Sequence, residues 1–192
     1  KPTEKPPILV GGGIYIPVEG TGAHHYHWSE ELAGSLMMGP KIRRIIADQG
    51  DGWLAVHPTA NEYQEIWSDV CEIAVGIGKD PASQPSYGGG RVLGMNWFTN
   101  CDDDPRKAWE GVQNQLTDFH GPPEGKSKAS TDLVDRWALS GTPEQIAAKI
   151  NSYIDIGVSV FQLVIASPNQ LEMMKRIAER VLPLVKRTVV KT

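Results

Sequence analysis

The sequence predicts an α/β fold built on a parallel sheet, and two observations carry this prediction. Short, almost entirely apolar runs, typical of strands buried on both faces, alternate with segments in which apolar residues recur at helical spacing. Glycine, proline and asparagine separate the two kinds of segment. Four such units in order imply parallel strands with right-handed crossovers. This pattern alone fits an open sheet and half of a barrel equally well.

The last quarter of the chain shows the repeating unit most clearly. Thr142 is expected to cap a helix, Pro143 suits its first turn, and Gln145 completes a capping box with Thr142. Apolar residues recur at helical spacing until Gly157. Residues 160–166 (VFQLVIA) then form a nearly continuous apolar run with a single polar residue, Gln162. We therefore expect a capped helix that leads into a buried strand.

The remaining elements follow from the same two patterns. Three further strands are expected at residues 8–10, 53–56 and 91–99. Further helices are expected at residues 29–48 with a break at the Gly39-Pro40 pair, 59–77, 104–118 and 169–185. Residues 14–28 and 120–130 are expected to be irregular loop excursions. All of these elements are assigned to a single domain over residues 1–192.

Composition narrows the function classes. The chain has 192 residues, 40% of them hydrophobic, and a net charge of −4, which argues against nucleic acid and anionic membrane as partners. No stretch of about 18 apolar residues occurs, so no membrane-spanning helix is expected. Cys71 and Cys101 form no metal or redox pattern, which favours a cytoplasmic location. The opening residues KPTEKPP are typical of a linker, so we expect a fragment of a longer protein.

Four motifs, in this order, resemble the second half of the bacterial-luciferase-like flavin oxidoreductases. They are residues 6–12 (PPILVGG), 45–53 (IIADQGDGW), 78–81 (GKDP) and 141–158, from GTPEQI to YIDIGV. In that family they lie at strand five, before strand six, before strand seven and in the last helix before strand eight. The resemblance implies a TIM (β/α)8-type barrel of which this chain holds only the C-terminal half, strands 5–8 with their helices. A complete barrel of this type needs about 250 residues.

The resemblance also implies a function. We expect an oxidoreductase that transfers a hydride between a deazaflavin coenzyme of the F-420 type and a small organic substrate. Members use F-420 or FMN, so an FMN-dependent monooxygenase is the alternative. A third interpretation is a non-catalytic half-barrel, or a phosphate-binding module, that needs a partner chain. The N-terminal half is expected as part of the same cleaved chain or as a separate subunit, and open sheet edges predict an oligomer.

Two glycine-containing segments are candidates for binding the cofactor phosphate. Glycines let backbone N–H groups approach an anion, and a helix N-terminus adds a favourable dipole. The resemblance implies that in the deazaflavin members a single Gly-Pro-Lys or Gly-Gly-Pro turn binds the cofactor phosphate. In this chain the corresponding residues are divided between two segments. The candidates are Gly11, Gly12 and Gly13, expected as a turn after the first strand, and Gly39, Pro40 and Lys41 at a helix start. The structural alternatives are a plain tight turn and a solvated lysine.

Catalytic residues in such barrels lie at the carboxyl ends of strands. His57 directly follows the strand expected at 53–56 and is the candidate acid–base residue of this half, although the resemblance places the principal base in the absent half. Thr59 and Asn96 are candidates for the substrate site, and Thr99, Asn100 and Ser167 share their positions at strand ends. Strand alternation allows only one of Asn96 and Thr99 to face the lumen.

Two further predictions concern single clusters. Arg136 resembles the arginine that meets the substrate phosphate in deazaflavin-dependent sugar-phosphate dehydrogenases; the alternative is an ion pair with Asp132 or Asp135. The histidines of residues 24–28 (HHYHW) lack an acidic or thiol partner at ligand spacing, so we favour an entrance loop over a metal site. Trp97 is expected to line the pocket.

Overall fold

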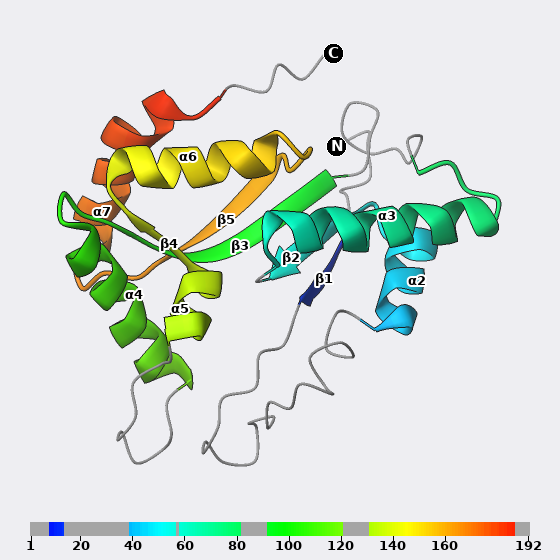
Figure 1. Cartoon of the computed structure of the whole chain (residues 1–192), viewed down its shortest axis with the longest axis horizontal. Coiled ribbons are helices and arrows are strands. Elements are labelled where there is room, and N and C mark those ends of the chain that lie inside the picture. Colours follow the sequence, from blue (N-terminus) through cyan, green and yellow to red (C-terminus); the bar gives the residue numbers. More distant parts are fainter. Residues whose placement is uncertain (1–7, 14–38, 57, 82–91, 121–130, 187–192) are drawn as a thin grey trace, which may run out of the picture.

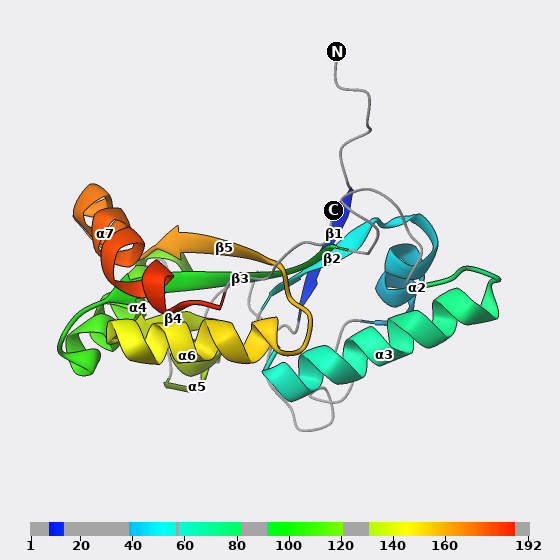
Figure 2. The ribbon, with the colours of Figure 1, turned by 90° about the horizontal axis from the view of Figure 1, so that it is seen from above.

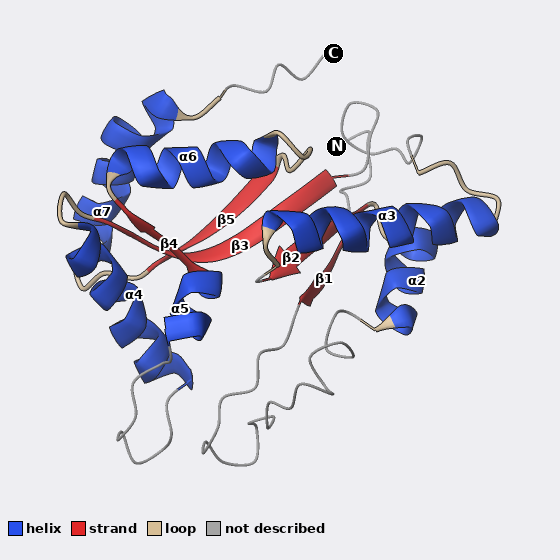
Figure 3. Ribbon diagram, in the orientation of Figure 1, coloured by secondary structure: helices blue, strands red, loops and turns tan. Residues whose placement is uncertain are grey.

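The computed structural model describes residues 8–13, 39–56, 58–81, 92–120 and 131–186. Five strands form one parallel sheet (Figure 3): β1 Leu9–Gly13, β2 Gly52–Val56, β3 Val92–Cys101, β4 Ala138–Gly141 and β5 Val160–Ile165. The helices are α2 Pro40–Gln49, α3 Ala60–Gly76, α4 Pro105–His120, α5 Thr131–Trp137, α6 Pro143–Ile154 and α7 Gln170–Arg176. A π-helical turn, Ile177–Val181, and a 3-10 turn, Leu182–Leu184, continue α7.

β3 is the central strand of the sheet (Figure 1). Its residues 92–96 pair with β2, residues 98–101 with β4 and residues 94–99 with β5, always in parallel. The part of β3 that pairs with β5 overlaps both the part that pairs with β2 and the part that pairs with β4. Each edge of a strand can pair with only one strand at a given residue, so β5 lies on one edge of β3 and both β2 and β4 lie on the other. β1 pairs with the outer edge of β2.

One face of the sheet is covered by α3 and α6, which lie in one layer below it in Figure 2. Each of these helices buries one stripe of apolar residues, as its spacing requires. Aromatic rings fill the space between: the Trp53 and Tyr63 ring centroids are 4.4 Å apart, and those of Trp97 and Tyr153 are 4.8 Å apart, edge to face. Trp97 is fully buried in this core, so the expectation that it lines the pocket is wrong.

The opposite face is covered only in part. α4 and α5 pack on the carboxyl half of β3, where Phe98 forms a second apolar cluster with Val112, Leu116 and Val134. Away from α4 and α5, Gly11 and Gln162 on this face are exposed, and Leu54 is half-buried. Within the described ranges, no helix covers that part of the face. We call it the uncovered face.

The predicted parallel α/β fold and its four strands are confirmed, and the boundaries differ in instructive ways. Gly11, Gly12 and Gly13 are strand residues paired with β2 and not a turn after the strand, because β2 supplies hydrogen-bond partners for the whole segment. The strand expected at 91–99 begins at Val92 and reaches Cys101. The excursion expected at 14–28 and residues 121–130 of the second excursion lie outside the described residues, whereas His120 still belongs to α4.

The structure contains one strand, β4, and one helix, α5, that the sequence did not predict. β4 has four residues (ALSG), too few to show an alternation, and it forms because the carboxyl end of β3 offers a free edge there. α5 directly precedes it and has only seven residues. None of the helices in the described ranges is long and apolar enough to cross a membrane.

Both capping boxes that start α3 and α6 are present. In α6 the Thr142 N–H donates to Gln145 Oε1 (3.0 Å) and the Gln145 N–H donates to Thr142 Oγ1 (3.4 Å), which confirms the predicted cap. Gly141 precedes this box with φ +138°, a conformation that favours glycine, and a Cβ added there would lie 2.5 Å from Gln145 Oε1.

We predict that Gly141→Ala lowers the free energy of unfolding by about 1–3 kcal/mol, because it strains the backbone and displaces the cap of α6. Urea unfolding measures this loss. The matched control is Gly76→Ala, at the end of α3, where an added Cβ has no atom within 4 Å. That variant is expected to lose no stability; equal stability of both variants would contradict the prediction.

Candidate active site at the carboxyl ends of the strands

The described half presents its chemistry at the carboxyl ends of parallel strands. β1 and β2 end together, because Gly13 pairs with Val56, and Val56 pairs in turn with Asn96 of β3. The loop after β2 leads into α3 through Pro58 and Thr59, and α5 and β4 lie beside the continuation of β3. Polar groups from these elements therefore meet at one edge of the sheet.

Thr59 and Arg136, which the sequence named separately, are brought together by Glu62. The Thr59 N–H donates to Glu62 Oε2 (2.7 Å), and Thr59 Oγ1 accepts from the Glu62 N–H (3.3 Å), so Thr59 caps α3. Arg136 Nη1 donates to both carboxylate oxygens of Glu62, at 3.1 and 2.9 Å. Glu62, which was not among the expected ion-pair alternatives, is thus a partner of Arg136. Asp135 instead accepts from Trp109 Nε1 (2.8 Å), and the side chain of Asp132 lies outside the described part of the chain. Glu62 itself was missed, although the T-x-x-E spacing that starts α3 was legible in the sequence.

Charge and burial explain why this cluster holds together. Burial raises the pKa of Glu62, but the hydrogen bonds from the Thr59 N–H and from the Arg136 guanidinium together outweigh burial, so the pKa lies below its ordinary value. The ion pair is partly shielded from water, with side-chain exposures of 30% for Arg136 and 23% for Glu62. Glu62 is therefore an ionised anchor for the arginine near neutral pH.

Two residues of α6 fix the surroundings of the cluster. Lys149 Nζ donates to the carbonyl oxygen of Ala138 (2.7 Å), directly after α5, and lies over the Trp97 ring. Tyr153 donates its hydroxyl to the carbonyl oxygen of Pro58 (2.7 Å). Burial raises the pKa of Tyr153 to about 12, with a further contribution from the Glu62 charge, so the hydroxyl stays protonated as a donor. The end of α5 and the loop before α3 are thus both tied to α6.

His57 lies outside the described residues, as do the histidines of residues 24–28. In sequence His57 stands between Val56, the last residue of β2, and Pro58, which is buried. Its predicted catalytic role stays a prediction. In the part of the chain that the structure describes, no group of three or more acidic, thiol or imidazole side chains is arranged to hold a metal ion.

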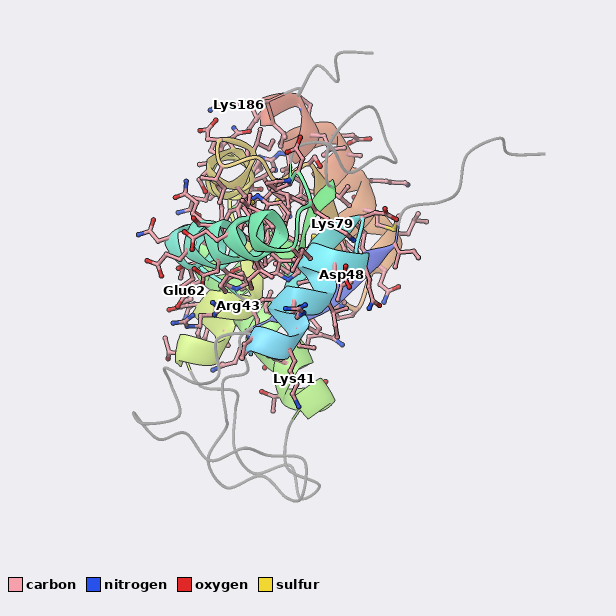
Figure 4. All side chains as sticks on the ribbon, turned by 90° about the vertical axis from the view of Figure 1, so that its right-hand side faces the viewer. Lys41, Arg43, Asp48, Glu62, Lys79 and Lys186 are labelled. Atoms are coloured by element: carbon pink, nitrogen blue, oxygen red, sulfur yellow. The ribbon has the colours of Figure 1, made fainter. Side chains whose placement is uncertain are left out.

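The first turn of α2 has the properties of an anion site. Gly39 is the N-cap and provides no side-chain cap, Pro40 occupies the first turn, and a Cβ added at Gly39 would have open space around it. Pro40 has no N–H and the Ile42 N–H donates to the carbonyl oxygen of Gly39 (3.0 Å), so in the described ranges the Lys41 N–H is the free donor of this turn. The helix start also carries partial positive charge. In Figure 4 the first turn of α2, with the exposed Lys41, is at the lower end of the helix. Asp48 and Lys79 form an ion pair near its upper end.

The glycines of β1 lie on the same side of the molecule as this turn. β1 and β2 point toward the lower side of Figure 1, where α2 begins. Gly11 is exposed, and a Cβ added there would meet no atom within 4 Å. Among the described residues, no hydrogen bond joins Gly11 with Gly39, Pro40 or Lys41. The two candidate phosphate segments therefore lie on the same side of the molecule, with no hydrogen bond between these residues in the described ranges.

Asn96 and Thr99 point to opposite faces of β3, as strand alternation required. Thr99 is fully buried beside the helix-covered core, whereas Asn96 is half-buried on the uncovered face. Asn96 lies within β3 and not at its end, because β3 continues to Cys101. Asn100 is buried under α4 and donates to the carbonyl oxygen of Ala166 (2.6 Å), so it holds the end of β5.

A surface pocket of about 390 Å³ lies beside α7, and Ser167 is part of its wall. Two arginines of that wall are already paired with the acidic residues after β3: Arg176 donates to Asp103 (2.6 Å), and Arg180 lies 2.8 Å from the same carboxylate. Because these pairs neutralise the arginines, they mainly attach α7 to the end of β3. We assign the pocket no ligand.

Comparisons with known proteins place the fold. No protein-family model and no curated protein matches the sequence. Solved structures do match. An F-420-dependent secondary alcohol dehydrogenase in complex with an F-420–acetone adduct has a TM-score of 0.64 at 18% identity, over 97% of this chain and 51% of that chain. The F-420-dependent tetrahydromethanopterin reductase from Methanopyrus kandleri has a TM-score of 0.56 at 16% identity, over 77% and 49%.

An FMN enzyme shares the same architecture. The oxygenating constituent of 3,6-diketocamphane monooxygenase from Pseudomonas putida, in complex with FMN, has a TM-score of 0.51 at 16% identity, over 78% of this chain and 47% of that chain. The chain thus has the fold of luciferase-like α/β barrels and spans about half the length of the structures it matches. The predicted resemblance is confirmed at the level of the fold.

We predict that Glu62→Gln lowers the free energy of unfolding at pH 7 by about 1 kcal/mol, because a charged hydrogen-bonded pair becomes a neutral one. The folded pKa of Glu62 lies below its unfolded value. The contribution is therefore complete above the unfolded pKa and is lost as the pH falls through the folded pKa. Urea unfolding at pH 7 and at successively lower pH should show the gap closing in acid.

The matched control for this prediction is Glu110→Gln, which breaks the exposed pair with Arg106 on α4 (3.6 Å). Exposed pairs of this kind contribute about 0–1 kcal/mol, so only a small effect is expected. A gap between wild type and Glu62→Gln that stays constant with pH would show that the ion pair is not its cause.

Proposed function

We propose that this chain supplies the carboxyl half of a flavin- or deazaflavin-dependent oxidoreductase with the luciferase-like fold. The observation that carries the proposal is the likeness of this chain to about half of such a barrel. The cluster of Thr59, Glu62 and Arg136 supports it, because it lies at the carboxyl ends of the strands. The remaining strands belong to the same polypeptide or to a separate subunit, and they cover the uncovered face.

A deazaflavin coenzyme of the F-420 type is the first candidate cofactor. The Gly39-Pro40-Lys41 sequence favours it, and two of the three enzymes compared above are described as F-420-dependent. FMN, and with it a monooxygenase activity, is the second candidate, supported by the FMN complex of the third enzyme. When bound, a deazaflavin would supply hydride transfer at its ring, whereas reduced FMN would supply the activation of oxygen.

The residues of this chain have binding and proton-handling roles in the proposal. The first turn of α2 binds the cofactor phosphate through the Lys41 N–H and the partial positive charge of the helix start, and the Lys41 side chain adds positive charge. Arg136, held by Glu62, binds an anionic group of the substrate. His57 takes the proton from the substrate hydroxyl when the substrate is oxidised, or gives a proton to the carbonyl oxygen when it is reduced. The class of small organic substrate stays open in this proposal.

The deciding experiment is an absorption spectrum and intact mass of gently purified native material, before any cofactor is added. The proposal predicts a flavin or deazaflavin band together with the remaining strands, in a longer chain or a second polypeptide. The shape of the band then distinguishes the two cofactors. A colourless, folded, solitary chain that takes up neither cofactor would refute the proposal and favour a phosphate-binding module.

We predict that Lys41→Glu weakens binding of the cofactor about 3–10-fold, because it replaces a positive charge near the phosphate by a negative one. Fluorescence titration of the cofactor-free protein with F-420 or FMN measures the change, which high salt should reduce. Lys107→Glu, an equal charge change on exposed α4, is the control and should leave the affinity unchanged. Equal affinities of the two variants would remove Lys41 from the phosphate site.

A further inference from the structure

Two side-chain amides lie next to each other on the uncovered face. Asn96 of β3 and Gln162 of β5 are register partners in adjacent parallel strands, so their side chains emerge side by side on the same face. Asn96 is half-buried and Gln162 is exposed. Gln162 is the single polar residue in the otherwise apolar strand β5, which has the sequence VFQLVI.

Neither amide is used by the fold as described. Among the residues that the structure describes, no side-chain hydrogen bond of Asn96 or Gln162 occurs, whereas Asn100, on the same face of β3, donates to Ala166. Each amide has a carbonyl acceptor and two N–H donors. Such groups need partners once a face is shielded from water, because an unpaired buried amide is costly. The pair is therefore suited to a polar ligand on this face.

Glycines and apolar side chains surround the two amides on this face. On the side away from β5, Asn96 pairs with Val56 of β2, and Val56 pairs in turn with Gly13 of β1, which has no side chain. The row before it contains Gly11, Leu54, Gly94 and Val160 on the same face. The Leu54 side chain lies against Gly94, whereas the space beside Gly11 is open. The two amides thus lie in the row where β1 and β2 end, beside a surface on which the glycines of β1 are next to the apolar side chains of Leu54 and Val56.

We infer that Asn96 and Gln162 bind the imide edge of the pyrimidine ring of a flavin-type cofactor. That edge presents a carbonyl, an N–H and a second carbonyl in one plane, and neighbouring primary amides present donors and acceptors at matching spacing. Asparagine and glutamine recognise the edges of flat heterocycles through such paired hydrogen bonds. The inference rests on the proposed function, but not on the choice of cofactor, because flavins and deazaflavins share this edge.

The test uses two ring probes without ribityl phosphate, lumiflavin and 3-methyllumiflavin, which differ by a methyl group on the imide nitrogen. Native material freed of its cofactor is titrated with each probe, and binding is followed by fluorescence. We expect lumiflavin to bind about tenfold tighter than its methylated analogue. In Asn96→Leu and in Gln162→Leu this preference should fall to nearly none, and lumiflavin itself should bind about tenfold more weakly.

Matched controls make the same chemical change on exposed helix positions, Gln64→Leu on α3 and Asn114→Leu on α4, and should keep the wild-type preference. Circular dichroism and a urea midpoint establish folding of each variant. Should Asn96→Leu not fold, Gln162→Leu decides, because its side chain is exposed.

The outcomes separate this inference from the proposed function. Equal binding of both probes by the wild type, or a preference that survives both substitutions, overturns the role of the amides while flavin binding stands. Failure of lumiflavin, FMN and F-420 to bind at all overturns the proposed function, and this inference with it.

Discussion

The described structure depends on the pairing of β3 with three other strands. Its ten residues offer enough backbone hydrogen-bonding groups for β2 and β4 on one edge and β5 on the other. Side chains alternate along it, so that Met95 and Trp97 enter the core between the sheet and helices α3 and α6, while Asn96 and Phe98 point to the other face. Every layer of the molecule therefore takes its position from this one strand.

A second constraint acts locally, at the carboxyl end of β2. Glu62 serves two purposes at once, since its carboxylate accepts from the Thr59 N–H at the start of α3 and from Arg136 in α5, 74 positions later. The cap of one helix is thereby the docking point of another. Arg136 is held at the end of the sheet because the Glu62 carboxylate, which caps α3, is already fixed at that position.

The sheet is asymmetric in a way that bears on function. The face toward α3 and α6 is filled with aromatic and aliphatic side chains, whereas the uncovered face carries glycines and two amides in its middle rows. A fully packed core needs large side chains, but a binding surface needs space and a few polar groups. This difference between the faces is the reason for proposing a ligand on the uncovered face, which in a complete barrel would face its interior.

The sequence by itself determined the elements whose signals are local. The capping boxes at Thr59 and Thr142, the helical stripes of α3 and α6 and the apolar run of β5 all depend on residues within a few positions of each other, and all were predictable, as was the fold class. The resemblance to luciferase-like barrels was legible because its motifs are also short segments in order.

Only the tertiary structure decided which distant residues meet. β4 is too short to have its own pattern and exists because β3 offers an edge; Gly11, Gly12 and Gly13 are strand residues because β2 pairs with them. The Glu62–Arg136 pair and the Asn96–Gln162 pair depend on register and crossover geometry. Register is a property of two strands together, and neither strand's sequence contains it alone.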